Sequence, residues 1–187
     1  MLETTEEAIL NLANLINHED VFQVFGEGLL LPRAESQENY GLELAGPIEW
    51  QITVSNTGGE DDFIVEGKIS GSAIMECRRC LEPSAAETET DFVYQMEYQH
   101  GKEGLSFSEA EDIEDILIFG NPSVNFADLI IELFLMSLPL TVLCKTDCKG
   151  LNNEGINLNL HPEAADNNKL EIEQKDSPFA SLKDFKV

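Results

Sequence analysis

The sequence has few basic residues. Its 187 positions hold 11 Lys and Arg against 36 Asp and Glu, which gives a formal net charge of -25. Such a surface repels phosphate backbones at long range, so broad electrostatic binding of nucleic acid is disfavoured and basic proteins are favoured as partners. A hydrophobic content of 42% is enough for a real core, and the length fits one domain.

Long apolar runs and targeting signals are also missing. The first residues, MLETTEEAILNLANL, carry three acids and no basic residue, unlike a secretory signal. The longest apolar stretch, Leu129 to Leu143, is interrupted by Glu132, Ser137 and Pro139 and is too short to span a membrane. We therefore expect a soluble, cytoplasmic protein without a membrane partner. In that reducing compartment, close cysteine pairs are metal ligands or reactive thiols rather than structural disulfides.

Motifs for catalysis are absent as well. Gly26 and Gly28 form neither a dinucleotide-binding pattern nor a phosphate-binding loop. The three histidines, His18, His100 and His161, have no Ser, Cys or carboxylate beside them in a recognisable catalytic motif. We expect no enzymatic activity, no catalytic residues and no small-molecule substrate.

Periodicity predicts an α+β fold in which an antiparallel meander is covered by one helix. Apolar residues alternate from Ile48 to Val54, again in a long run from Phe63 to Cys77, and again from Phe92 to Tyr98. Turn-length connections between these three strands favour antiparallel pairing. A helix near residues 125–138, capped by Asn125 and stopped by Pro139, should cover one face of the sheet.

The N-terminal segment predicts a further helix, because Thr4 and Glu7 have capping-box spacing and apolar residues follow at helical intervals over Thr5 to Asn17. Residues 21–32 receive no assignment, and residues 33–39 are polar and turn-like. Residues 103–115 hold six acids and are expected to form a solvated loop, followed by a short strand from Ile116 to Phe119.

The expected organisation is one domain with a tail. Residues 1–160 form a single α+β domain that includes the N-terminal helix. Residues 161–187 are rich in acidic and polar side chains, and we expect them to form a weakly ordered tail.

The four cysteines fall into two close pairs. Cys77 and Cys80 form C-x2-C, and after 63 residues Cys144 and Cys148 form C-x3-C. Zinc takes four such ligands in a tetrahedron, so the spacing predicts a zinc site if the fold brings the pairs together. The competing interpretation is that Cys77 is a buried core residue, since it continues the apolar face of its strand. A redox pair is less favoured, because no βαβ pattern surrounds C-x2-C.

Four of the eleven basic residues lie beside these cysteines: Arg78, Arg79, Lys145 and Lys149. One interpretation is a contact for RNA or another partner. The other is that the cations offset the charge of a four-thiolate zinc centre, or are simply solvated. The second is slightly favoured, because four cations add only a modest phosphate-binding term.

Three segments carry a family resemblance: GSAIMECRRCLEP, NFADLIIELFLMSLPL and CKTDCKGLNNEGINLN. Their patterns, C-x-R-C-L-E, D-L-x2-E-x5-L-P and C-x3-C-x-G-L, resemble in the same order those of the bacterial YceD-like family, the large ribosomal RNA subunit accumulation proteins. The likeness covers roughly Ile48 to Leu160. Family members usually carry a further C-P-x-C-G element, and here Asn152 to Gly155 stand in its place.

The resemblance implies a ribosome biogenesis factor that supports accumulation of large-subunit ribosomal RNA and has no known enzymatic activity. Its partner would be that ribosomal RNA or a basic ribosomal protein, and the acidic surface favours the protein. Zinc is the cofactor that the cysteines would hold. The alternative function is a zinc-stabilised structural or protein-interaction module with no direct RNA role.

Overall fold

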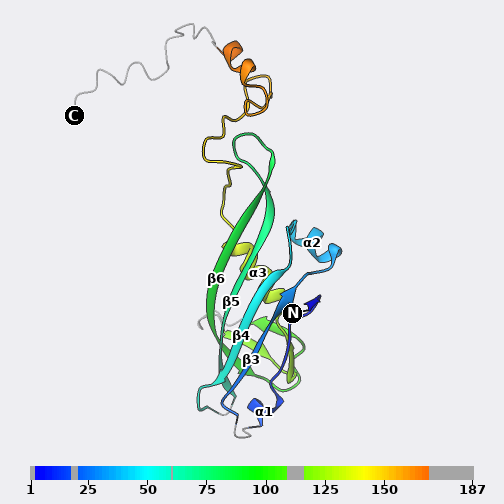
Figure 1. Cartoon of the computed structure of the whole chain (residues 1–187). Coiled ribbons are helices and arrows are strands. Elements are labelled where there is room, and N and C mark those ends of the chain that lie inside the picture. The colour runs from blue at the N-terminus through cyan, green and yellow to red at the C-terminus, as the bar shows by residue number, and fades with distance from the viewer. Residues whose placement is uncertain (1–2, 18–20, 60, 109–115, 169–187) are drawn as a thin grey trace, which may run out of the picture.

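The computed structural model describes residues 3–17, 21–59, 61–108 and 116–168 (Figure 1). Its main sheet has seven strands in the order β1-β3-β4-β5-β6-β8-β7, and β2 and β9 form a separate pair. The strands are β1 (Thr4–Thr5), β2 (Ile9–Asn11), β3 (Gln23–Leu30), β4 (Ile48–Asn56), β5 (Asp62–Glu76), β6 (Pro83–Tyr98), β7 (Leu105–Phe107), β8 (Ile116–Phe119) and β9 (Ser123–Asn125). The helices are α1 (Ala13–Ile16), α2 (Ala34–Tyr40), α3 (Ala127–Ser137) and the 3-10 helix η1 (Pro162–Asn168).

The antiparallel meander accounts for the middle of the main sheet. Strands β3, β4, β5 and β6 follow one another and pair in antiparallel fashion, as the alternation predicts for the last three. The sheet as a whole is mixed, because β1 pairs with β3 and β8 pairs with β6 in parallel. A pure meander is therefore an inexact description of this α+β fold.

One face of the meander forms the core. Ile48, Trp50, Ile52 and Val54 of β4 are all buried on this face, as their alternation predicts. Helix α3 covers it, and Phe134 packs against Gly71, where a Cβ would lie only 2.9 Å from the phenyl ring. Gly71 thus lets the helix approach the sheet closely.

Helix α3 confirms the covering helix predicted near residues 125–138. The Asn125 side-chain oxygen accepts hydrogen bonds from the N–H groups of Ala127 and Ala8, each at 3.1 Å. The N-cap of α3 is Phe126 and not the predicted Asn125. Asn125 instead closes the turn just before the helix and fastens the N-terminal segment to it.

The predicted helix over Thr5–Asn17 is wrong for most of its length. Only Ala13–Ile16 is helical, and β1 and β2 precede it. Ile9 pairs with Asn125 and Leu10 with Val124 of β9, so distant backbone pairing replaces the local helical turn. The Thr5 hydroxyl donates to the Glu7 carbonyl at 2.6 Å and does not cap a helix. A short helix is marginal by itself, which is why tertiary pairing decides this segment.

Two neighbouring segments also differ from the sequence-based expectation. Residues 23–30, which carried no assignment, form β3, and Gly28 lies where a Cβ would meet the Trp50 indole at 3.0 Å. The polar stretch expected to be turn-like is helix α2, which ends at Gly41 with a φ of 61°.

The remaining expectations fall on short elements and on the chain end. Ile116–Phe119 is a strand, as predicted, and β7 occupies part of the expected acidic loop. Residues 109–115 of that loop and residues 169–187 of the expected tail lie outside the described residues. Among the helices of the described part, none is long and apolar enough to cross a membrane.

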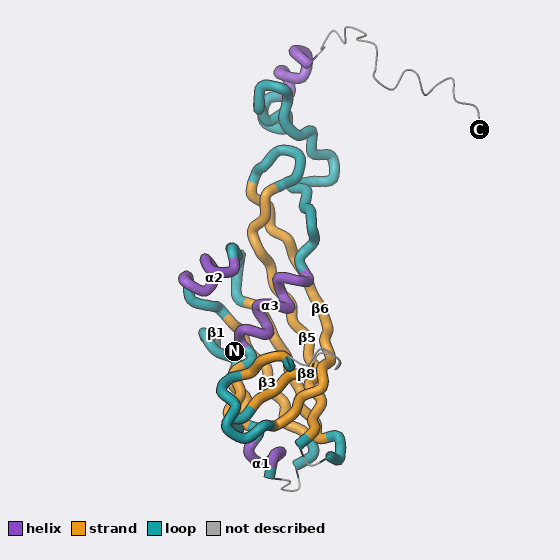
Figure 2. Tube along the Cα trace, turned by 180° about the vertical axis from the view of Figure 1, so that it is seen from behind, coloured by secondary structure: helices purple, strands orange, loops and turns teal. Residues whose placement is uncertain are grey.

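Strands β5 and β6 form a long hairpin that extends beyond the rest of the sheet (Figures 1 and 2). Strand β4 pairs with β5 only as far as Glu49 opposite Ser70, and Leu44 makes one further bridge to Ala73. Beyond that point the hairpin continues to Glu76 opposite Pro83. We call residues 71–88 the distal hairpin. Its tip lies at the end of the molecule opposite α1, beside residues 144–160.

Candidate metal centre

The tip of the distal hairpin is a tight turn over Cys77 to Glu82. The Cys77 N–H donates to the Glu82 carbonyl at 2.9 Å, and the Leu81 N–H donates to the Cys77 carbonyl at 2.8 Å. These bonds place both cysteines on the inner side of the turn, where Cys77 is 0% and Cys80 3% exposed. The interpretation of Cys77 as a buried residue is thus consistent with its place in the turn.

Leu81 has an unusual backbone in this turn. Its φ is 62°, in the left-handed region that a side chain with a Cβ disfavours. Its side chain is 56% exposed, so packing does not hold it there. The turn imposes the conformation, because the Leu81 N–H bonds back to the Cys77 carbonyl and the next residue, Glu82, accepts from the Cys77 N–H.

The second cysteine pair reaches the tip through the segment that follows α3. Val142 forms a parallel bridge with Cys77, and the Arg78 N–H donates to the Val142 carbonyl at 3.0 Å. The next turn closes with the Cys148 N–H donating to the Lys145 carbonyl at 3.1 Å. The bridge at Val142 thereby brings Cys144 and Cys148 next to Cys77 and Cys80.

The four thiols form one cluster. The Sγ atoms of Cys77 and Cys148 are 3.8 Å apart, those of Cys80 and Cys144 are 3.5 Å apart, and all four lie within 4.8 Å of one another. All four cysteines are free thiols. Thiolates around zinc at ~2.3 Å would have sulfur atoms about 3.8 Å apart. The donor set and its spacing therefore fit a tetrahedral zinc ion.

Local hydrogen bonds favour thiolates in half of the cluster. The Cys144 backbone N–H, followed by those of Arg79 and Cys80, lowers the pKa of Cys77 to about 6. For Cys148, burial acts to raise the pKa, but donation from the Asn159 amide and the Gly150 N–H leaves it lowered. A thiolate is the form that binds a metal, so the lowered pKa of these two residues would favour metal binding.

Cys144 differs from the other three. The residue is exposed as a whole, yet its thiol faces the cluster. Loss of water around the thiol, then hydrogen bonding to Cys80 and Cys148, raises the pKa of Cys144 to about 12. A metal ion would displace this proton, because binding requires the thiolate.

Residues outside the cluster hold it in place. The Asn159 side-chain amide donates to Cys148 Sγ at 3.3 Å, and its oxygen accepts from the Lys149 N–H at 2.9 Å. The Arg79 guanidinium donates to the Cys148 carbonyl at 2.8 Å. Such supporting contacts orient metal ligands. Sequence reasoning missed Asn159, because nothing in its local pattern distinguishes it from a loop asparagine.

The four predicted contact cations lie at the same tip. Arg78, Arg79, Lys145 and Lys149 are all exposed. Within the described part of the chain, the recorded ion pairs involve none of them. Arg79 has a structural role through Cys148. Its guanidinium therefore helps to assemble the site, while the other three project into solvent.

Asn152 organises the loop that stands in place of the second cysteine element. Its side-chain oxygen accepts from the N–H groups of Glu154 at 3.0 Å and Ile156 at 2.9 Å, and Gly155 has a φ of 80°. The asparagine is 8% exposed. Side-chain hydrogen bonds thus close this turn without further metal ligands.

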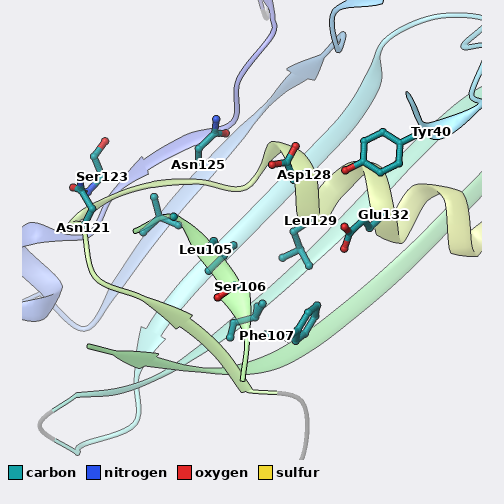
Figure 3. A pocket seen from close by; sticks show the side chains of 13 residues that line it. Tyr40, Leu105, Ser106, Phe107, Asn121, Ser123, Asn125, Asp128, Leu129 and Glu132 are labelled. Carbon is teal, nitrogen blue, oxygen red and sulfur yellow. The ribbon is translucent and has the colours of Figure 1, made fainter. Parts of the chain in front are cut away.

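A separate hollow of about 580 Å³ lies between α3 and strands β7 and β8 (Figure 3). Tyr40, Asp128 and Glu132 gather at one end of it, and Asn121 and Ser123 lie at the other. Burial, followed by the charges of Asp128 and Glu132, raises the pKa of Tyr40. No histidine lines this hollow, and it holds no nucleophile paired with a base among the described residues.

Comparison with known proteins identifies the C-terminal two thirds of the chain. A family model described as "Large ribosomal RNA subunit accumulation protein YceD" matches residues 65–186. The match includes the hairpin tip, α3 and all four cysteines. Searches of curated proteins and of solved structures give no match.

Proposed function

The chain belongs to the YceD family of large ribosomal RNA subunit accumulation proteins, and we propose that it is a ribosome biogenesis factor that supports accumulation of this RNA without catalysing a reaction. The observation that carries the proposal is the family match over residues 65–186. Because ribosomes assemble in the cytoplasm of bacteria, we place the protein there.

A basic ribosomal protein is the proposed partner. The net charge of -25 attracts lysine- and arginine-rich chains and repels phosphate backbones. The cations at the tip are too few to reverse this balance, although Lys145 and Lys149 are free to contact a phosphate that the ribosomal protein brings with it. An acidic surface of this kind shields a basic protein until the protein meets its RNA.

Zinc would be held by Cys77, Cys80, Cys144 and Cys148, and its role would be structural. With four cysteine ligands a zinc ion has no open position for substrate, as in structural sites elsewhere. The ion would tie the hairpin tip to the segment after α3. The site would therefore fix the shape of the tip rather than perform chemistry.

Cells that lack the protein provide the test. We expect a lowered level of large-subunit ribosomal RNA and a smaller large-subunit peak in a ribosome profile, both restored by the wild-type chain. A normal profile and normal RNA level in the deleted strain would contradict the proposal.

Affinity capture from lysate separates the two partner classes. We expect a ribosomal protein to be recovered at low salt, to be lost at high salt and to be retained after nuclease treatment. Recovery that depends on intact RNA would instead make ribosomal RNA the partner.

The second candidate function is a zinc-stabilised structural or protein-interaction module with no direct RNA role. Its support is the way in which the four thiols cross-link two chain segments. A strain carrying a metal-free variant such as Cys144→Ser distinguishes it. Normal ribosomal RNA levels in that strain, and in the deleted strain, would favour this second function.

A further inference from the structure

Strand β6 has an open edge. It pairs with β5 along its length, from Pro83 to Glu97, but with β8 only over Gln95–Tyr98. Within the described parts of the chain, no strand pairs with the other side of residues 84–94. An unpaired edge presents backbone donors and acceptors to any extended segment that reaches it.

The ladder contacts identify which residues of β6 face this edge. In an antiparallel ladder, residues alternate between those bonded to the neighbouring strand and those whose backbone groups point away from it. At the tip, the Cys77 N–H donates to the Glu82 carbonyl, and at the base, the Tyr98 N–H donates to the Asp61 carbonyl. The even-numbered residues of β6 therefore form the hydrogen bonds to β5. The Gln99 N–H donates outward to Phe119. The outward positions are therefore odd-numbered: Glu87, Glu89, Asp91 and Val93.

The same four residues project their side chains into solvent. All four are exposed, and Val93 is 66% exposed. The carboxylates of Glu87, Glu89 and Asp91 follow one another at intervals of two residues, which is about 6.7 Å along a strand. Glu89 is paired with Lys68 at 2.7 Å in an exposed contact. Backbone hydrogen-bonding groups and negative charge thus coincide along the edge.

A hollow lies on the exposed sheet face next to Glu87 and Glu89, inward from the open edge and over β5. It has a volume of about 550 Å³ and is lined by Ser70, Ser72, Glu87 and Glu89, together with residues of the segment before β4. Its hydroxyl and carboxylate groups are suited to a cationic side chain. A long cationic side chain of a strand added at the edge would extend across the face of β6 toward this hollow, and such side-chain contacts give specificity to peptides bound at a sheet edge.

We propose that the β6 edge, defined as residues 87–93, binds an extended lysine- and arginine-rich protein segment as an added strand. The peptide backbone would bond to the outward N–H and C=O groups, and alternate cationic side chains would reach Glu87, Glu89 and Asp91. RNA is disfavoured at this edge, since its phosphates would face three carboxylates. A second copy of the chain is disfavoured for the same reason, because pairing β6 with itself would bring two acidic rows together. The assignment of this segment to a ribosomal protein rests on the proposed function.

The contribution of the edge carboxylates is tested by measuring the affinity of the full chain for a fluorescent peptide of alternating Lys and Thr. Replacing Glu87, Glu89 and Asp91 by Gln, Gln and Asn should weaken binding about tenfold at low salt, since three ion pairs are lost. The matched control neutralises Glu27, Glu35 and Glu38, which lie on β3 and α2 away from the edge, and should change affinity less than about twofold. If the edge variant and the control variant lose the same peptide affinity, the peptide is attracted by the overall negative charge of the protein, and the edge site is overturned.

Backbone pairing is tested separately. Asp91→Pro removes an outward N–H that β5 does not use, and proline is tolerated at such edge positions. It should weaken peptide binding more than Asp91→Ala does, with an unchanged thermal midpoint as the check on folding.

Hydrogen exchange of the unaltered protein provides a readout that needs no variant. Bound peptide should slow exchange of the amides of Glu87, Glu89, Asp91 and Val93 and leave those of Thr88 and Thr90, already bonded to β5, unchanged. Peptide bound at saturation without slowing at these four amides would overturn the proposal. Slowing by a ribosomal RNA fragment, and not by the peptide, would replace the protein partner with RNA.

The proposed function can fail independently of this edge. Peptide binding with the expected exchange pattern, combined with normal ribosomal RNA in the deleted strain, would leave the edge site in place and contradict the biogenesis role. Reduced ribosomal RNA in the deleted strain without any peptide binding would do the reverse.

Discussion

The thiol of Cys80 lies 3.5 Å from that of Cys144, although 64 positions separate the two residues in the chain. Between them the chain completes β6, three further strands and α3. The contact therefore exists only when the sheet, the helix and the hairpin tip are all in place. Metal binding should report on the folding of the whole domain.

Cysteine variants test the metal centre. Cys77→Ser and Cys144→Ser should both release metal and lower the free energy of unfolding by similar amounts, each well above about 1 kcal/mol. Urea denaturation and elemental analysis measure the two effects, and we expect about one zinc per chain in the wild type. If Cys77 is only a core residue, its loss should cost about 1 to 2 kcal/mol while Cys144→Ser has little effect.

Asn159 tests the support of the ligands. Asn159→Ala removes the amide that donates to Cys148 Sγ and should lower zinc affinity about tenfold, as the loss of a supporting contact does in other metal sites. Competition with a chromophoric chelator measures the affinity. Asn153→Ala, at an exposed position of the same loop, is the matched control and should retain wild-type affinity. Identical affinities for all three proteins would remove Asn159 from the site.

Leu81 tests the backbone of the tip turn. Leu81→Gly should stabilise the protein by up to about 1 kcal/mol, because glycine adopts a positive φ without the steric penalty of a Cβ. Leu81→Ala keeps that penalty and serves as the control. Thermal or urea denaturation of the zinc-loaded proteins gives the comparison, and a glycine variant less stable than the alanine variant would contradict the expectation.

Gly67 tests the close packing of the central strands. A Cβ at this position would lie 2.6 Å from the Gln51 carbonyl oxygen and 2.6 Å from the Phe92 ring. Gly67→Ala should therefore cost about 1 to 3 kcal/mol, since backbone cannot move aside as a side chain can. At Gly46 an added Cβ meets nothing within 4 Å, so Gly46→Ala should leave the urea midpoint unchanged. A similar midpoint for both variants would show that β5 can shift to accept the methyl group.

Sequence patterns predict the centre of the fold well and its edges poorly. The alternation of Ile48, Trp50, Ile52 and Val54 can be recognised in the sequence because one face of β4 is buried and the other faces solvent. The N-terminal segment misleads, because its apolar spacing suits a helix while β9, 112 or more positions away, pairs with it as a strand. Among the side chains described in helix α2 none is fully buried, so its sequence resembles a polar turn.

The candidate site divides in the same way. Spacing alone makes Cys77 and Cys80 candidate ligands for one ion, because a short turn can present both thiols, but it leaves the alternative of a buried core cysteine open. The gap to Cys144 is closed by a ladder contact at Val142, which no local pattern encodes. Asn159 and the open edge of β6 are likewise results of tertiary structure. They can be found only once the strand order is known.

The continuous ladder of β5 and β6 has a mechanical consequence. The 15 residues of β5 span roughly 50 Å, and the acidic edge and the cysteine-bearing tip lie on this one rigid hairpin. The hairpin therefore holds the acidic edge and the tip at a constant separation. An assembly that contacts both places must match a fixed distance, and its two weak contacts would combine into avidity without either becoming strong.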